Sequence, residues 1–497
     1  MKLKSNSSEC VLVIDIGSSS IKANLYSMQA HMLSEFSTQI YHSVFTDKSG
    51  CFVQDPKVLS EKIIQSIDII LSKSKDKIGK ILAVGFDSMS STILAIDKEG
   101  NPITPLYLYS DTRSYKQVNE IFKNFDKDKL FDQTGVTQHT SYIPSKILWL
   151  KNELNISAEK FIDFPTYFYS EIFENFNYDS SYSIASWSGL LDRKKLLWHE
   201  ELLSYLNITE ENLPNLFSYE KKNVGLKTKY KKRWTAIKDS PFHLSVGDGL
   251  AANIGSGATK SDRIGLTIGS TGAMRILLPK SNNKIPKGLW EYQFTNKYSL
   301  LGGSFSEGGN IISWAQKNLR LSDINNLDSI LSKKIPGQHG ISVLPFFAGE
   351  RSTGWNDNAK AVFDGLTFST EPDDILQAML ESLAIRFSLV LDIIKKKSSI
   401  DYRIILSGGV FRKSEWFIQA LSDIIDCPLE ILNTPEETSR GTAILSIIQM
   451  INDLEFASFE IENNRIINPI KRNTEIYMDE KNKHINLYNI NREKYDL

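Results

Sequence analysis

Two segments far apart in the chain share one pattern of hydrophobic and polar positions. Residues 11–16 form an apolar run, residues 17–20 are small, and apolar side chains then alternate with polar ones up to Tyr26. The pattern returns in residues 264–278, where the small residues 269–272 separate two runs of the same kind. Alternation with a period of two is typical of strands, so each segment predicts a strand, a tight turn and a returning strand. The repeat predicts a chain with two related halves.

Further segments add elements to each half. Residues 80–86 predict another strand, and residues 146–150 carry an apolar face that predicts a helix packed under the sheet of the first half. In the second half, residues 404–406 predict a strand that is followed by a turn at residues 407–409. Apolar residues on one helical face come after Ser414, which we expect to be the N-cap. A strand, a turn and a helix thus close the second half.

The length of 497 residues exceeds what one hydrophobic core usually organises, so we expect two large domains. Residues 225–240 are rich in Lys, Arg and Thr and poor in periodic apolar positions, which is typical of a linker or an exposed connection. After about residue 453 the composition shifts to Asn, Lys, Glu and Ile. We therefore predict an N-terminal domain (1–245), a C-terminal domain (246–455) and a peripheral segment (456–497) without chemistry.

Charge and cysteine content restrict the partners. The 58 Lys and Arg residues nearly cancel the 59 Asp and Glu residues, so no overall field attracts nucleic acid or an anionic membrane surface. Cys10, Cys51 and Cys427 lack CxxC spacing, which argues against a disulfide framework and a structural zinc site. The apolar run after the polar start is too short for a signal peptide or a spanning helix. These features predict a cytoplasmic protein with a small-molecule partner.

The first turn gathers groups that bind phosphate. Asp15, Gly17, Ser18, Ser19 and Lys22 supply a carboxylate, a permissive glycine, hydroxyls and an ammonium group. Backbone N–H groups of a tight turn bind anions, serine hydroxyls add donors, and Asp15 can hold Mg²⁺ directly or through water. The turn is not a P-loop, because GxxxxGK[ST] is absent and a strand follows. The alternative is a serine-rich hairpin without a ligand.

A second and a third turn strengthen the nucleotide hypothesis. Gly269, Ser270 and Thr271 form a similar turn in the second half, so two turns can grip a polyphosphate from opposite sides. Gly408 and Gly409 come between a strand and a helix, where paired glycines let a flat base approach the backbone closely. The alternative for this third turn is a plain connection between strand and helix.

Asp248 is the candidate general base. It lies between Gly247 and Gly249 at the start of a run of small residues that permits close helix packing. A carboxylate in the first turn of a helix is favoured in its ionised form by the helix dipole, and an open site leaves it free to accept a hydroxyl proton. A helix N-cap is the equally supported alternative.

Other polar residues are candidates for the substrate side. Asp111, Arg113 and His139 lie in the first half and offer hydrogen-bonding and charged groups, although surface structure explains them as well. In the second half, residues 349–356 combine two glycines and Trp355 with the ion-pair candidates Glu350 and Arg351. Such a loop often lines a site, and ordinary packing of Trp355 is the alternative.

Taken in order, these motifs resemble the FGGY carbohydrate kinases from about Val11 to about Ile447. Residues 15–22 and 269–272 resemble the two phosphate turns of the family. Residues 109–113 are similar to its Trp-x-Asp-x-Arg segment, residues 146–150 to its Lys-x-x-Trp element, and residues 407–416 to its adenosine region. The resemblance implies an α/β fold with two ribonuclease-H-like domains, as in actin-like ATPases, around a central cleft.

The resemblance also implies roles for single residues. It makes Asp248 the general base, with ATP and Mg²⁺ as cofactors. Ser90 and Ser91 stand where many relatives have Met-His beside the sugar, and Tyr109 replaces the usual Trp. The positions that match the nucleotide-binding residues of the family are Ser19, Ser270, Gly309, Ser313, Gly409 and Lys413.

The expected function is transfer of the γ-phosphoryl group of ATP to a small sugar or sugar acid. Residues 344–356 most resemble the gluconate-kinase branch, so D-gluconate is the first choice, and a ketopentose such as D-xylulose or D-ribulose is the alternative. A rival from another class is an actin-like or Hsp70-like ATPase switch without a sugar substrate. The oligomeric state is left open, with a homodimer as one option.

Overall fold

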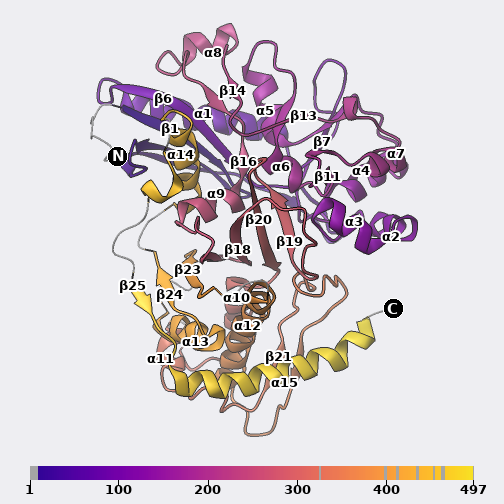
Figure 1. Ribbon diagram of the computed structural model, residues 1–497, viewed down its shortest axis with the longest axis vertical. Coiled ribbons are helices and arrows are strands. Elements are labelled where there is room, and N and C mark those ends of the chain that lie inside the picture. Colours follow the sequence, from indigo (N-terminus) through magenta and orange to yellow (C-terminus); the bar gives the residue numbers. More distant parts are fainter. Residues whose placement is uncertain are drawn as a thin grey trace.

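The computed structural model describes residues 9–323, 326–396, 400–409, 414–432, 436–451, 454–459 and 465–495. It contains two lobes, each built on a seven-stranded mixed sheet (Figure 1). The sheet of the first lobe contains β14 (Lys222–Asn223), β15 (Phe242–His243), β6 (Lys80–Ser88), β1 (Glu9–Ile16), β2 (Ser20–Ser27) and β3 (Met32–Tyr41) in this order, with β16 (Val246–Gly247) also paired to β6. The sheet of the second lobe has the order β19 (Trp290–Gln293), β20 (Tyr298–Phe305), β18 (Gly272–Pro279), β17 (Arg263–Ile268), β23 (Arg403–Ser407), β24 (Leu429–Ile431) and β25 (Arg465–Ile467).

The predicted repeat is present in these sheets. In the first lobe β1 pairs antiparallel with β2 and parallel with β6. In the second lobe β17 pairs antiparallel with β18 and parallel with β23. Both strand, turn and strand segments therefore occupy the same place in their sheets, which confirms the two related halves.

Helices cover each sheet and supply the two main cores. In the first lobe α1 (Pro56–Ser74) and α5 (Phe164–Ile172) place Ile63, Ile67 and Phe168 in one buried cluster with the strands. In the second lobe α10 (Gly309–Asn318), α12 (Pro372–Lys395) and α13 (Glu415–Ile425) do the same. Ser414 caps α13, as expected, because its side chain accepts a hydrogen bond from the backbone N–H of Phe417.

Several further elements are short. They are β4 (Phe45–Thr46), β5 (Phe52–Gln54), β7 (Leu94–Ile96), β8 (Leu106–Tyr107), β9 (Lys160–Ile162), β10 (Asp179–Ser181), α6 (Tyr182–Ser186), β11 (Leu191–Asp192), β12 (Leu197–Trp198), β13 (Asn215–Phe217), α11 (Leu327–Leu331), β21 (Ser342–Leu344), β22 (Val362–Asp364) and the 3₁₀ helices Glu210–Asn212 and Phe456–Phe459. No helix in the described ranges is long and apolar enough to span a membrane.

The basic segment at residues 225–240 is not a linker. It contains α8 (Thr228–Arg233), and Tyr230, Trp234 and Ile237 are buried in the core of the first lobe. Arg233 forms an ion pair with Asp68 of α1, and the indole N–H of Trp234 donates to the same carboxylate. The prediction failed because the many positive charges in this segment obscured the few apolar residues that pack in the core of the first lobe.

The helix predicted at residues 146–150 exists, but it does not pack under the first sheet. It is α4 (Ile143–Asn152), which packs with α2 (Tyr115–Asn124) and α7 (Glu200–Leu206) in a separate core. Every residue from Ile143 to Leu150 is buried, so the helix has no single apolar face to indicate its partner. The short α3 (Lys127–Thr134) belongs to the same part of the lobe.

The segment after residue 455 is less peripheral than its composition predicts. Strand β25 extends the second sheet, and α15 (Lys471–Tyr495) runs along α13, β21 and α12 (Figure 1). Tyr477 and His484 of α15 are buried, and the Tyr477 hydroxyl donates to Glu381 of α12. Widely spaced aromatic and histidine side chains thus anchor a helix that is otherwise polar.

Two helices cross where the lobes meet. Helix α9 (Asp248–Gly255) and α14 (Glu437–Ile448) touch through glycines, because a Cβ at Gly255 or Gly441 would lie 1.8 Å from a backbone carbonyl oxygen of the other helix. The run of small residues after Asp248 therefore does permit close helix packing. Helix α14 also packs on β1 and β6, although it lies within residues 246–455. The domain boundaries at 245 and 455 stay predictions.

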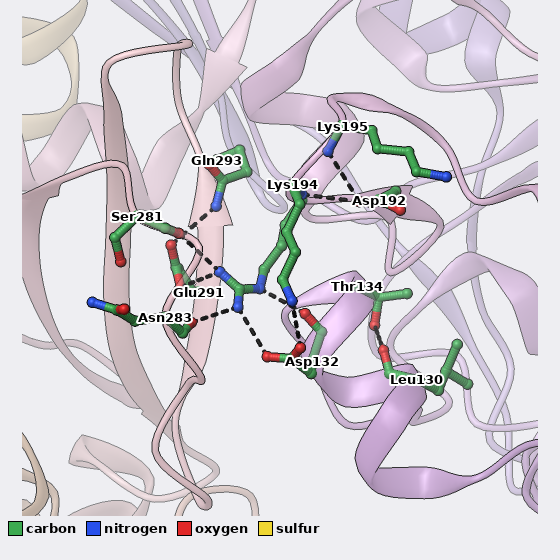
Figure 2. Close-up of polar contacts among 11 residues, drawn as sticks. Leu130, Asp132, Thr134, Asp192, Lys194, Lys195, Ser281, Asn283, Glu291 and Gln293 are labelled. Atoms are coloured by element: carbon green, nitrogen blue, oxygen red, sulfur yellow. Dashed lines mark hydrogen bonds and ion pairs between the residues drawn. The ribbon is translucent and has the colours of Figure 1, made fainter.

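A buried polar cluster also joins the lobes. The guanidinium of Arg193 is fully buried and donates to Asp132 of the first lobe and to Glu291 of β19, at 3.0 Å each. It also donates to the carbonyl oxygens of Ser281 and Asn283. Figure 2 shows Asp132 beside its helix on one side and Ser281, Asn283 and Glu291 on the other. These bonds connect the lobes at a second place.

Candidate active site

A cavity of about 220 Å³ is lined by residues of both lobes. The first lobe contributes residues from the loop after β6 and from the segments beside α4 and α6. The second lobe contributes the turn at residues 269–272, β18 and β19. The lining residues include Ser90, Ser91, Tyr109, Tyr142, Trp187, Asp248, Gly269, Thr271, Arg275, Tyr292 and Arg351. Six of the residues named from sequence thus meet in one place, namely Ser90, Ser91, Asp248, Gly269, Thr271 and Arg351.

Asp248 is the first residue of α9, and Gly247 occupies the N-cap position. The Asp248 carboxylate lines the cavity and accepts a hydrogen bond of 2.7 Å from the backbone N–H of Gly249. A Cβ at Gly247 would lie 2.6 Å from the Ser90 hydroxyl, and one at Gly249 would lie 2.9 Å from Trp187. Both flanking glycines therefore make room for the cavity wall, and Asp248 is not the helix cap.

Electrostatics favour a proton acceptor at this position. Burial raises the pKa of Asp248 to about 6, the charge of Arg275 opposes that rise, and the charge of Asp15 adds to it. A carboxyl with such a pKa is mostly ionised at neutral pH yet holds a proton more readily than an exposed aspartate. This is the balance that a general base needs.

Asp15 lies beside a second carboxylate that the sequence analysis missed. Asp15 and Asp87 are partners in the parallel pairing of β1 and β6, and burial raises the pKa of both. Thr442 of α14 donates to Asp87 Oδ2 at 2.7 Å, whereas the buried Asp87 Oδ1 has no hydrogen-bond partner in the described part of the chain. The sequence feature that could have indicated Asp87 is its position as the acidic residue at the end of the apolar strand β6. The described residues contain no group of three side chains suited to a metal ion.

Hydrogen bonds to its backbone hold the first predicted phosphate turn, residues 17–20, in place. Gln54 donates to the carbonyl of Ser18 at 3.0 Å, the backbone N–H of Gly17 donates to Ser20, and the side chains of Ser18 and Ser19 are exposed. Lys22 forms an ion pair of 2.5 Å with Glu436, which precedes α14. The exposed serines are thus available to a ligand, while the ammonium group of Lys22 already has a partner.

The second and third turns lie against each other and against α10. The carbonyl of Gly269 accepts the backbone N–H of Gly309, and Ser270 accepts that of Asn310, which places this turn at the start of α10. Gly408 has a φ of 94°, and a Cβ there would lie 2.3 Å from the carbonyl oxygen of Ile268. Gly409 faces open space, and Ser313 of α10 is exposed. Lys413 lies outside the described residues.

Three predicted substrate residues do not line the cavity. Arg113 pairs with the buried Asp111 and lies 4.8 Å from the ring centre of Trp149. His139 forms an ion-pair contact with Asp357 and lines a different groove. Local partners have engaged all three side chains.

Comparison with known proteins agrees with this arrangement. The N-terminal domain of the FGGY family of carbohydrate kinases matches residues 10–255, and the C-terminal domain of that family matches residues 267–450. The chain belongs to the FGGY family of carbohydrate kinases. The expected two-domain α/β fold of the actin-like ATPases is confirmed.

Individual FGGY relatives span most of the chain. The gluconokinase of Bacillus subtilis is 27% identical over 452 residues, with 88% of this chain and 87% of the relative covered. The xylulose kinase of Staphylococcus xylosus is 24% identical and covers 98% of this chain and 99% of its own length. The gluconate kinase structure from Lactobacillus acidophilus has a TM-score of 0.89 at 23% identity, with 98% and 99% of the two chains covered.

The FGGY chain has an aromatic wall that its sequence did not reveal. The rings of Trp187 and Tyr292 stack with centroids 3.9 Å apart, and the Tyr142 and Tyr292 hydroxyls lie 2.9 Å apart. These residues come from three distant segments, so no local pattern indicated them. Arg275 had a weak signal, because it is the one charged residue in the alternating strand after the second turn. Flat aromatic faces suit the CH surfaces of a sugar chain.

Proposed function

We propose that this FGGY kinase transfers the γ-phosphoryl group of ATP to a hydroxyl of a small sugar acid, with D-gluconate as the first choice. The observation that carries the proposal is the Asp248 carboxylate, which lines the cavity next to the second turn and has a pKa raised to about 6. Phosphoryl transfer asks the protein to position two substrates, neutralise charge and accept one proton.

In the proposed reaction Asp248 accepts the proton of the attacking hydroxyl group. The hydroxyl oxygen forms a bond to the γ-phosphorus while the bond from that phosphorus to the β,γ-bridging oxygen breaks. The electron pair of the broken bond stays on ADP, and the proton ends on the Asp248 carboxylate. Ser90, whose buried hydroxyl has no partner in the described residues, is placed to orient a hydroxyl of the acceptor.

We assign the nucleotide to the three turns. The exposed Ser18, Ser19 and Ser270 offer hydroxyl and backbone donors to phosphates, and the start of α10 faces the second turn. The open space at Gly409 suits the approach of a flat base. Lys22 contributes positive charge if Glu436 releases it, so its assignment as a phosphate ligand stays a prediction.

Asp15 and Asp87 fit a magnesium ion. Two adjacent buried carboxylates with an unpartnered oxygen repel each other unless a cation or a proton lies between them. Mg²⁺ is usually bound by one or two carboxylates together with waters and phosphate oxygens. Bound there, it would neutralise phosphate charge.

The choice of gluconate over a ketose rests on the gluconokinase relatives and on residues 344–356. The xylulose kinases support a ketopentose as the second candidate, and the neutral hydroxyls of Ser90 and Ser91 suit either acceptor. A cytoplasmic location and a homodimer stay predictions.

The test compares kcat/KM for D-gluconate, D-xylulose and D-ribulose at saturating Mg-ATP. We expect gluconate to have the highest value. A ketose preferred by about tenfold or more, which equals about 1.4 kcal/mol in the transition state, would refute the gluconate assignment and leave the kinase assignment in place.

A further inference from the structure

Two arginines line the cavity, and they differ in what balances their charge. Arg275 lies on β18, and Arg351 lies in the loop after β21. Burial lowers the pKa of Arg275, Asp248 opposes that effect, and Arg351 adds to it. The charges that act on Asp248 are those of Arg275 and Asp15. The charge of Arg275 therefore interacts with both Asp248 and Arg351.

Arg275 has partners within the cavity wall. It donates to the Thr267 hydroxyl at 3.1 Å, and the nearby Asp248 supplies the opposite charge. Because Asp248 balances Arg275, the charge of Arg351 has no carboxylate partner among the described residues of the cavity.

Arg351 carries that unbalanced charge. Its buried Nε, like that of Arg275, has no hydrogen-bond partner among the described residues, and its guanidinium lies 6.0 Å from the ring centre of Trp355. The neighbouring Glu350 cannot serve it, because that carboxylate already accepts from Arg386, Tyr488 and the backbone N–H of Gly354. The Arg351 side chain is half-buried and no carboxylate among the described residues pairs with its charge, so the cavity is suited to a ligand that brings an anion.

The other cations near the substrate side are engaged elsewhere. Arg113 pairs with Asp111, and His139 contacts Asp357. Lys146 is fully buried, donates to the carbonyl of Thr140, and has its pKa lowered to about 7 by burial. None of the three lines the cavity of Asp248.

We propose that Arg351 is the specificity-determining residue that binds the carboxylate of a sugar acid, in the cavity that Asp248 also lines. The planar guanidinium can donate two parallel hydrogen bonds to a carboxylate. The charge of Arg351 opposes the rise in the pKa of Tyr142 and Tyr292, and the hydroxyls of both residues, which lie within hydrogen-bonding distance of each other, are also part of the cavity lining. An acyclic acid anchored there presents its far hydroxyl to Asp248. The inference rests on the proposed kinase function and narrows its acceptors to aldonates.

The first experiment measures steady-state kinetics of Arg351→Met with D-gluconate and with the neutral acceptors D-xylulose and D-glucitol. Loss of a charge-assisted hydrogen bond should raise KM for gluconate on the order of 10-fold to 150-fold. We expect kcat and the KM for ATP to stay within about threefold, and kcat/KM for neutral acceptors likewise. Arg351→Lys should recover part of the gluconate affinity, because lysine keeps the positive charge but cannot donate two parallel hydrogen bonds to one carboxylate.

The matched control is Lys287→Met. Lys287 is exposed, pairs with Asp128 and lines the neighbouring groove, so its loss removes the same charge without touching the cavity. It should leave all constants unchanged. Equal losses of kcat/KM for all acceptors in Arg351→Met, or a raised KM for ATP, would overturn the proposal, because Arg351 would then act on the phosphate side.

The second experiment titrates D-gluconate into wild type and Arg351→Met by calorimetry without nucleotide, after thermal melting has shown that both are folded. Binding by wild type that weakens at least about tenfold in the variant supports the subsite, whatever the turnover. Equal affinities overturn it. If wild type phosphorylates ketoses but neither binds nor phosphorylates gluconate, the subsite fails and the kinase function stands. If wild type binds gluconate but phosphorylates no acceptor, the kinase function fails and the subsite is judged by the calorimetry alone.

Discussion

The site has two groups of charged side chains that are built differently: an acidic end, defined as Asp15, Asp87 and Asp248, and a basic end, defined as Arg275 and Arg351. Asp248 and both arginines line the cavity. Asp15, Asp87 and Asp248 lie at the ends of β1 and β6 and at the start of α9, which are regular elements. Arg275 lies on β18, but Arg351 lies on a loop whose shape depends on Glu350 and on Tyr488 of the C-terminal helix. The acidic end and Arg275 are thus fixed by secondary structure, whereas Arg351 is fixed by tertiary contacts.

This difference has a functional meaning. The carboxylates at the acidic end are desolvated, and the charge of Asp15 raises the pKa of both Asp87 and Asp248, so they are suited to receive a proton or a metal ion. The basic end offers a fixed positive charge, so it is suited to hold an anion. We expect the residues for the reaction shared by a kinase family to lie on regular elements, whereas a loop can change and with it the acceptor that is bound.

The largest effect is expected at the acidic end. Asp248→Asn should lower kcat by about a hundredfold to ten-thousandfold, because the amide has nearly the same shape but cannot accept the proton. Steady-state kinetics at saturating gluconate and ATP measures this change, with little change expected in the affinity for ATP. More than a tenth of the wild-type kcat in the variant would show that another group is the base.

The same substitution should have the opposite effect on stability. Because the pKa of Asp248 is raised in the folded protein, its contribution to stability is complete below about pH 4 and is lost as the pH rises through about 6. Asp248→Asn should therefore melt at a higher temperature than wild type at pH 7, and the gain should disappear near pH 4. A variant that is less stable than wild type at pH 7 would contradict the raised pKa.

The cavity is complete only while the lobes stay in register, because residues of both lobes line it. Arg193→Met would remove the cationic partner of the buried Glu291 and the donor to two carbonyl groups, at a cost of about 3–5 kcal/mol in the free energy of unfolding. The matched control is Lys194→Met, because Lys194 pairs with the same Asp132 but is 34% exposed, and an exposed pair contributes about 1 kcal/mol or less. Urea unfolding of both variants makes the comparison, and equal losses would show that the buried cluster has no special role.

A smaller effect is expected from pH. Since Asp248 must be ionised to accept a proton, kcat should fall about tenfold for each unit below pH 6 and level off above it. The pH profile of kcat with gluconate, which stays ionised over this range, reports this group. A flat profile between pH 5 and 7 would separate the titration of Asp248 from catalysis.

The smallest effect is expected where α15 supports the basic end. The Tyr488 hydroxyl donates to Glu350 at 2.8 Å, so Tyr488→Phe should loosen the loop that carries Arg351. A loss of about 1 kcal/mol would raise KM for gluconate about fivefold and leave kcat unchanged. Tyr477→Phe is the control, because it removes a similar hydroxyl of the same helix from Glu381, away from the loop. Similar KM values for both variants would separate α15 from substrate binding.

Sequence reasoning succeeded where local rules apply. The two turns, the strands beside them and the position of Asp248 in the first turn of a helix follow from alternation, small residues and glycines. It failed where the partner is distant. Arg113 and His139 looked available, but Asp111 and Asp357 hold them, and the aromatic wall of Trp187 and Tyr292 forms only when the lobes come together.

The proposed reaction couples ATP cleavage to phosphorylation of an acid that Arg351 binds, with Asp248 accepting the hydroxyl proton. The most direct measurement counts ADP and phosphorylated D-gluconate in one reaction of the wild-type protein with Mg-ATP, with and without the acid. We predict one ADP for each phosphorylated acid, and ADP formation at background when the acid is omitted. ADP formed at the same rate without the acid, and no phosphorylated product with it, would contradict the account and favour an ATPase that acts as a switch.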